Sequence, residues 1–181
     1  MTYPYHPCAE PLAARYERAA PWRPSQAYKS AIQAQTLELY HAIPLTIVRL
    51  PEEPCPDMEC LARHVAQGVM PVRIRNPHSS HPVLGHFMTE FRVVHDYYGH
   101  VVAGNPFGLA GELAAYRQHC QRHYDAWLLP YVWQNVVLEN AYFEARGHWP
   151  HPAAKSGDPR GCAFCAAPIR YDVEKFGEPR L

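Results

Sequence analysis

The chain has 181 residues, a length that suits one domain with a single hydrophobic core. Its 17 Lys and Arg residues balance its 17 Asp and Glu residues, so no net charge favours nucleic acid or an anionic membrane as a partner. Because no apolar run approaches ~20 residues and the N-terminus lacks the pattern of a secretion signal, we expect a cytoplasmic protein that acts on a small molecule.

The first elements along the chain are an arm, a helix and an extended segment. Prolines interrupt residues 1–24, and we expect an extended arm there. Apolar residues recur at roughly helical spacing over 25–43, and Ser25 can cap this helix. Residues 44–50 are short and rich in β-branched side chains, which favours an extended segment.

A second helix and a loop follow. The pattern over 57–69 predicts a helix that Asp57 caps and that ends near Gly68. The prolines within 71–85 predict a loop. This part of the chain therefore offers the domain at most a short β element.

The main helical core is expected within residues 87–147, where prolines are rare. Its hydrophobic pattern predicts three helices, at about 87–103, 109–126 and 127–146. The third is apolar almost all round and should be buried. We expect residues 148–181 to form a loop-rich tail and the whole chain to be a mainly α, single-domain protein.

Residues 95–100 read HDYYGH, with two histidines five positions apart. On an ideal α-helix such positions differ by about 140° in direction, so both side chains reach one ion only if it lies between them. Gly99 leaves room beside the second histidine. Two imidazoles and one carboxylate are the open ligand set of non-heme Fe(II) oxygenases, and imidazole also suits zinc. His95 and His100 are therefore candidate ligands, although the chain has 12 histidines and some pairs arise by chance.

A carboxylate ligand is expected from the third helix, where Glu139 and Glu144 are the only acids after Asp125. A carboxylate in such an apolar setting is costly unless it is paired, protonated or bound to a metal. Arg146 can pair with one of the two glutamates, which leaves the other as the ligand. This reasoning does not choose between them.

Polar side chains on the second helix predict further roles near the same ion. Glu112, Tyr116, His119 and His123 are separated by steps of four, three and four residues, so they lie close to one helical face. We expect Glu112 and His119 to relay protons or to complete a second metal position, the alternative being a solvated surface stripe. Asp96 is expected to orient a ligand or a bound water molecule.

The HDYYGH string resembles the H-[D/E]-x-x-G-H iron motif of the pterin-dependent aromatic amino acid hydroxylases. The resemblance implies a mononuclear iron held by His95, His100 and either Glu139 or Glu144, with hydroxylase chemistry on a small, aromatic substrate. That family also uses tetrahydropterin, whose binding segment has no recognisable counterpart in this chain. The candidates for its substrate-binding arginine are Arg73, Arg75 and Arg92.

A second resemblance covers three strings in one order, namely FRVVHDYYGH, GELAAYRQH and EARG. They are similar to an uncharacterised domain of large phage-type polyproteins, a likeness that implies residues but no reaction. It favours Glu144 over Glu139 as the carboxylate. The residues that it singles out are His95, Asp96, His100, Glu112, His119 and Glu144.

Two other functions remain open at this stage. The pair His95 and Asp96, with His64 upstream and Asp158 or Asp172 downstream, is similar to the metal site of the HD-type phosphohydrolases. A zinc ion with four protein ligands would instead make the chain a non-catalytic binding module. The iron enzyme is the preferred hypothesis, because the phosphohydrolase leaves the second histidine of HDYYGH without a role.

The cysteines show no disulfide framework, and a cytoplasmic setting would keep them reduced. Cys162 and Cys165 have the C-x-x-C spacing of half a zinc site. A second such pair is missing from the sequence, so His148, His151 or Cys120 would have to complete the site. A loop with two buried or redox-capable thiols is the alternative.

Overall fold

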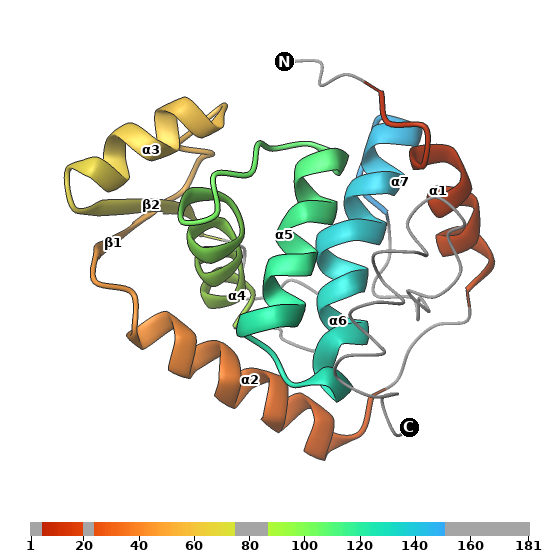
Figure 1. The fold of residues 1–181 in the computed structure, drawn as a ribbon, viewed down its shortest axis with the longest axis horizontal. Coiled ribbons are helices and arrows are strands. Elements are labelled where there is room, and N and C mark those ends of the chain that lie inside the picture. The colour runs from red at the N-terminus through yellow and green to blue at the C-terminus, as the bar shows by residue number, and fades with distance from the viewer. Residues whose placement is uncertain (1–4, 20–23, 75–86, 151–181) are drawn as a thin grey trace.

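The computed structural model describes residues 5–19, 24–74 and 87–150. This part of the chain is mainly helical with one short parallel sheet, which confirms the predicted fold class (Figure 1). In chain order the elements are α1 (Ala9–Arg18), α2 (Gln26–His41), β1 (Thr46–Leu50), α3 (Met58–Ala66), β2 (Val69–Arg73), α4 (Met88–Val94), η2 (His95–Val101), α5 (Leu109–Arg122), η3 (Ala126–Leu128), α6 (Leu129–Trp133), η4 (Gln134–Leu138) and α7 (Glu139–Arg146).

The described part of residues 1–24 is not the extended arm that its prolines predicted. It contains α1, which packs beside α7 (Figure 1). The buried side chains of Leu12 and Tyr16 lie one turn apart, and the Tyr16 ring meets that of Tyr142 edge-on with centroids 5.6 Å apart. The prediction was wrong because Pro11 occupies the first turn, where its missing N–H breaks no helical hydrogen bond.

The segment β1, α3 and β2 forms one parallel β-α-β unit. β1 confirms the extended segment predicted over 44–50, and Asp57 caps α3 as predicted by accepting the N–H of Cys60 at 2.8 Å. β2 was not predicted, because Pro71 suggested a loop. Pro71 pairs with Val48 in a sheet of two strands, both of them edge strands, where proline is tolerated. Most of the predicted loop lies outside the described residues.

Helix α2 runs along the bottom of the view in Figure 1. Ser25 caps it as predicted, because its hydroxyl accepts the N–H of Tyr28 at 3.2 Å. The hydroxyl of Tyr28 in turn donates to the carbonyl of Leu128 at 3.0 Å, and buried Thr36 shares a hydrogen bond of 3.2 Å with Tyr124. These bonds hold α2 against the segment that joins α5 to α6.

Two long helical segments and α5 build the core. One segment runs from α4 into η2, the other runs through α6, η4 and α7, and α5 packs against both (Figure 1). The second segment is largely buried, as predicted, and its Trp133 ring lies 4.9 Å from the ring of Tyr116 on α5. Each segment contains a π-helical stretch, in which hydrogen bonds span five residues instead of four. Among the described helices, none combines the length and the apolar character that crossing a membrane requires.

Candidate metal centre

His95 and His100 project to the same side of η2. An α-helix would separate them by about 140°, whereas a π-helical turn closes between residues five apart and so places one nearly above the other. Their Nε2 atoms are 3.0 Å apart, and the two rings stand at 83° to each other. The local backbone therefore brings the two imidazoles together.

Glu112 of α5 supplies a third donor atom at the same place. Its Oε2 lies 2.9 Å from Nε2 of His95 and 3.4 Å from Nε2 of His100. The exposed fraction is 9% for His95, 0% for His100 and 6% for Glu112, so the donors are shielded from water. We call these three residues the donor triad. In the described part of the chain, the triad is one of two groups whose ligand atoms lie close enough to share an ion.

The spacing of the donor triad fits a divalent transition metal. Adjacent donors about 2.1 Å from an ion lie about 3.0 Å apart in octahedral and about 3.4 Å apart in tetrahedral coordination. The three observed separations cover this range. Among the described residues, the buried Oε2 of Glu112 has no polar neighbour in hydrogen-bonding geometry apart from these two imidazole nitrogens. When their lone pairs face the centre of the triad, the oxygen lacks a donor, a costly condition that a cation would relieve. Three donors also leave further coordination positions for other ligands.

The loop after η2 sets the orientation of the His100 ring. Nδ1 of His100 lies 3.1 Å from the carbonyl oxygen of Asn105, which can only accept, so Nδ1 carries the hydrogen. The side-chain amide of Asn105 also donates to the carbonyl of Gly99 at 2.7 Å, which anchors the loop to η2. Gly111 lets the loop lie on α5, because a Cβ there would be 1.6 Å from the carbonyl oxygen of Pro106.

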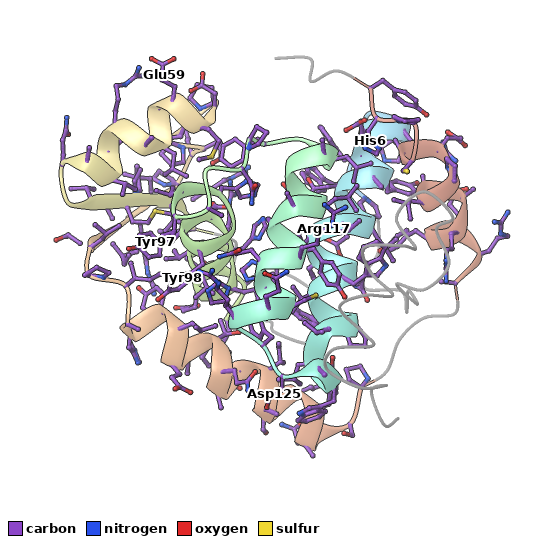
Figure 2. All side chains as sticks on the ribbon, viewed as in Figure 1. His6, Glu59, Tyr97, Tyr98, Arg117 and Asp125 are labelled. Carbon is purple, nitrogen blue, oxygen red and sulfur yellow. The ribbon has the colours of Figure 1, made fainter. Side chains whose placement is uncertain are left out.

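A row of histidines leads from the triad toward the surface. Nδ1 of His95 lies 3.2 Å from Nε2 of His119, and Nδ1 of His119 lies 3.2 Å from Nδ1 of His123. We call these three residues the histidine row. When Nε2 of His95 faces the triad, its Nδ1–H donates to His119, which then donates to His123. The row ends beside Tyr98, whose side chain extends from η2 (Figure 2) and whose ring lies 4.6 Å from that of His123.

The donor triad carries charged side chains, whereas His119 in the histidine row is neutral. Burial disfavours the charged form of His100, but the Glu112 carboxylate outweighs burial and raises the pKa of His100 to about 9. Burial also opposes the Glu112 carboxylate, yet His100 and His95 lower its pKa to about 2. Burial and the neighbouring histidines lower the pKa of His119 well below its ordinary value, so His119 is neutral. A metal ion in the donor triad would therefore compete with a proton for Nε2 of His100, whereas the neutral His119 outside the triad holds no such proton.

At Gly99 the helical segments η2 and α5 approach each other closely. A Cβ at Gly99 would lie 2.9 Å from Cβ of Ala115, 3.1 Å from Nε2 of His119 and 3.2 Å from Nδ1 of His95. The sequence predicted that Gly99 leaves room beside His100. In the structure, the absence of a side chain at Gly99 instead allows the contact between His95 and His119.

Glu144, the carboxylate ligand that the resemblance to the polyprotein domain favoured, is not grouped with His95 and His100. Its Oε1 accepts the backbone N–H of His6, and its Oε2 accepts the backbone N–H of Leu109 at 3.3 Å. Glu139 is half-buried, and neither glutamate belongs to a group with metal-ligand spacing among the described residues. The carboxylate beside the two histidines is that of Glu112, which was expected to relay protons or to complete a second metal position. Glu112 lies there because α5 packs on η2, and the spacing of residues along the chain does not predict that packing.

Arg146 pairs with neither of these glutamates. Its guanidinium lies 2.6 Å from Glu10 and 2.8 Å from Glu17, both on α1. The expectation that Arg146 neutralises one acid of its own helix was therefore wrong, because α1 packs beside α7 and offers two carboxylates at closer range. The ion pairs tie the N-terminal helix to the core.

Asp96 makes its ion pair with Arg92, at 3.4 Å, and not with a triad histidine. Arg92 also contacts Glu53 at 2.7 Å, so this candidate for binding a substrate carboxylate is already engaged. Of the other two candidates, Arg73 ends β2 at an exposed position, and Arg75 lies outside the described residues. Asp96 thus holds the side chain of Arg92, one turn earlier on the same helical segment, and Arg92 in turn connects this segment to the loop before α3.

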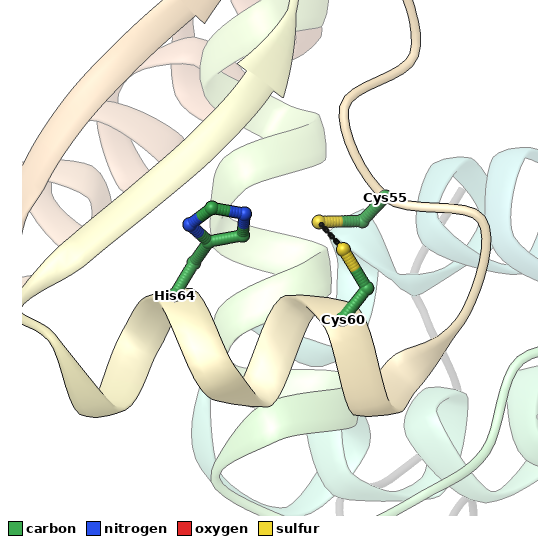
Figure 3. Close-up of side chains that lie close together, drawn as sticks. All are labelled: Cys55, Cys60 and His64. Atoms are coloured by element: carbon green, nitrogen blue, oxygen red, sulfur yellow. Dashed lines mark hydrogen bonds between the residues drawn. The ribbon is translucent and has the colours of Figure 1, made fainter.

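The second group with metal-ligand spacing contains Cys55, Cys60 and His64 (Figure 3). His64 was the upstream histidine of the phosphohydrolase hypothesis, and the structure groups it with two thiols rather than with His95. Both candidate aspartates of that hypothesis, Asp158 and Asp172, lie outside the described residues. So do Cys162, Cys165 and His151 of the possible C-terminal zinc site.

Sequence reasoning found both histidines and assigned Glu112 a different role. A signal for Glu112 was present, because Glu112 and His119 are seven residues apart and so share one face of α5, the face that meets η2. Tyr116 was expected on that face but turns its ring to Trp133. Comparison of the chain with protein-family models, curated proteins and solved structures gave no match, so the donor triad itself is the basis for a function.

Proposed function

We propose that the protein is a mononuclear non-heme iron enzyme, similar in chemistry to oxygenases and hydroxylases, and that the donor triad holds its iron. The observation that carries the proposal is the convergence of two imidazole Nε2 atoms and one carboxylate oxygen within 3.4 Å of one another in a buried site. Two histidines and one carboxylate are the ligand set of the non-heme Fe(II) oxygenases. Fe(II) bound there would supply the activation of O2 at its open coordination positions.

Neighbouring residues orient the ligands and carry protons. Asn105 accepts from Nδ1 of His100 and His119 accepts from Nδ1 of His95, so both Nε2 lone pairs point to the centre of the triad. The negative charge of Glu112 balances a cation in surroundings that exclude water, where the attraction is strong. Because Nε2 of His95 would bind the ion, the histidine row serves only the proton on Nδ1 of His95, which can move toward the surface through His119, the residue that we propose as a relay.

The substrate in this proposal is a small molecule with an aromatic ring. The ring of Phe107 lies 4.9 Å from that of His100 and gives the centre an apolar wall. Aromatic side chains pack edge-on or in offset stacks against flat ligands, with a few polar groups to orient them. Phe107 is only half-buried, so part of this ring is open to solvent.

Metal analysis of the full-length protein tests the proposal. The protein is stripped with a chelator, reloaded with Fe(II) without oxygen and desalted, and its iron is then measured by mass spectrometry. We expect one iron per chain in the wild type and at least about a tenfold weaker affinity in His100→Ala and in Glu112→Ala, because each change removes a ligand. His41→Ala, at the exposed end of α2, is the matched control and should bind iron as the wild type does.

Oxygen uptake tests the reaction class on the same samples. We expect the iron-loaded protein to consume O2 when aromatic amino acids or phenols are supplied, with tetrahydropterin added or left out as a second variable. A tightly held zinc that iron cannot replace, without O2 uptake, would contradict the proposal and favour a zinc-stabilised binding module. Phosphate release from a nucleotide panel that depends on His95 would contradict it in favour of a phosphohydrolase.

A further inference from the structure

Cys55, Cys60 and His64 form a second cluster, remote in sequence from the donor triad and without a role in the proposed reaction. We propose that this thiol cluster binds a second, softer divalent ion, for which Zn²⁺ is the natural probe. The proposal goes beyond the iron site, and either can fail without the other. Figure 3 shows the three side chains turned toward one space, Cys55 from the loop before α3 and the other two from α3 itself.

The local fold explains why the three side chains meet. Cys60 and His64 are four residues apart, so they occupy one face of α3. Asp57 caps the helix by accepting the N–H of Cys60 at 2.8 Å. The chain enters the helix through this cap, and Cys55, two residues before Asp57, lies beside the same face. All ligand atoms lie within 4.8 Å of one another, and the two sulfur atoms are 3.0 Å apart.

Two thiolates and one imidazole are ligands that zinc prefers. Zinc–sulfur bonds of about 2.3 Å place two sulfur atoms about 3.8 Å apart in a tetrahedral site, so the thiols must separate slightly on binding. Cys55 is buried and holds its place, whereas Cys60 is half-buried and can turn about its side-chain bonds. His64 is half-buried as well, so the cluster is partly open to solvent and a water molecule could complete the coordination of an ion held there.

The charges around the cluster favour a cation. The acids Asp57 and Glu53 both act electrostatically on the Cys55 thiol, and Glu53 also pairs with Arg92. The same negative surroundings attract a divalent ion, whose charge then stabilises the thiolates.

Titration of the reduced, metal-stripped full-length protein with Co²⁺ tests the proposal. Thiolate ligands give Co²⁺ a charge-transfer absorption that imidazole and carboxylate ligands do not, so the donor triad does not contribute to it. We expect this absorption in the wild type, its loss in Cys55→Ser/Cys60→Ser and its displacement by Zn²⁺. It should persist in His100→Ala and in the matched control Cys162→Ser/Cys165→Ser.

Alkylation of the wild type gives a second measurement that does not depend on a variant folding. We expect Zn²⁺ to slow the labelling of Cys55 and Cys60 by at least about tenfold, as read by peptide mass spectrometry, because a bound thiolate is protected. Equal labelling with and without Zn²⁺ would overturn the proposal. So would a charge-transfer absorption that survives Cys55→Ser/Cys60→Ser or disappears in Cys162→Ser/Cys165→Ser, since the thiolates would then come from other cysteines.

Discussion

Gly99 sets how closely η2 approaches α5. In an ordinary helix, alanine is more stable than glycine by about 0.5–1 kcal/mol. At this position an added Cβ would lie 2.9 Å from Cβ of Ala115 and 3.2 Å from Nδ1 of His95. We therefore expect Gly99→Ala to lower the free energy of unfolding by about 1–3 kcal/mol, the usual range for an overpacked core. Urea denaturation of the metal-free protein measures the change.

The double variant Gly99→Ala/Ala115→Gly is the matched control for this prediction. Removal of the Ala115 Cβ relieves the shortest of the contacts, so the double variant should be more stable than the sum of the two single changes indicates. A Gly99→Ala protein more stable than the wild type would mean that the backbone can move apart. In that case, the close packing of His95 on His119 would not require a glycine at position 99.

Helix α5 depends on a neighbouring element for its first turn. Gly108 precedes it and has no side chain to cap it, and Glu144 of α7 supplies the acceptor for the N–H of Leu109. We expect Glu144→Gln to lower the free energy of unfolding by about 0.5–2 kcal/mol, because it removes a negative charge at a helix N-terminus and weakens a capping bond. The iron content should not change. Chemical denaturation and metal analysis of one preparation measure both quantities.

Glu112→Gln makes the same chemical change within the donor triad and serves as the comparison. We expect it to lose iron while its helical content, measured by circular dichroism, stays the same, because the amide is a much weaker ligand than the carboxylate. Loss of iron from Glu144→Gln and its retention in Glu112→Gln would assign the ligand role to Glu144, as the resemblance to the polyprotein domain implied.

Helix caps with a local signal were predicted, and two elements that contain prolines were not. The caps at Ser25 and Asp57 follow from side chains that bond to N–H groups three residues away, so sequence patterns reveal them. Helix α1 was missed because the prolines of residues 1–24 outweighed the helical spacing of its apolar residues, which bury against α7. Strand β2 was missed because Pro71 is acceptable only on an edge strand, and strand position is a property of the whole sheet.

For the whole molecule, the donor triad joins two segments that the chain order separates. A metal ion held by η2 and α5 together binds the folded state and not the unfolded chain. Such an ion at a concentration of a hundred times its dissociation constant adds about 2.7 kcal/mol to the free energy of unfolding. We expect Fe(II) to raise the Tm of the metal-free wild type by about 5–10 °C. Thermal unfolding followed by circular dichroism without oxygen measures the shift.

The variant His100→Ala is the control for this shift, since it lacks one ligand and should respond to Fe(II) far less than the wild type does. Cys55→Ser/Cys60→Ser should respond as the wild type does, because its thiols lie outside the triad. A wild-type Tm that does not change with saturating Fe(II) would contradict the assignment of the triad as a metal centre.

The sequence by itself determined the mainly α class, the helix caps and the two candidate histidines, because each of these depends on residues a few positions apart. It did not reveal the π-helical turn, which closes the 140° separation expected of His95 and His100 on an ideal helix. Only the tertiary structure decided that Glu112 joins them, since that contact depends on how α5 packs on η2. The spacing of residues along the chain determines which of them share one face of a helix. The packing of the whole core determines which other element that face contacts.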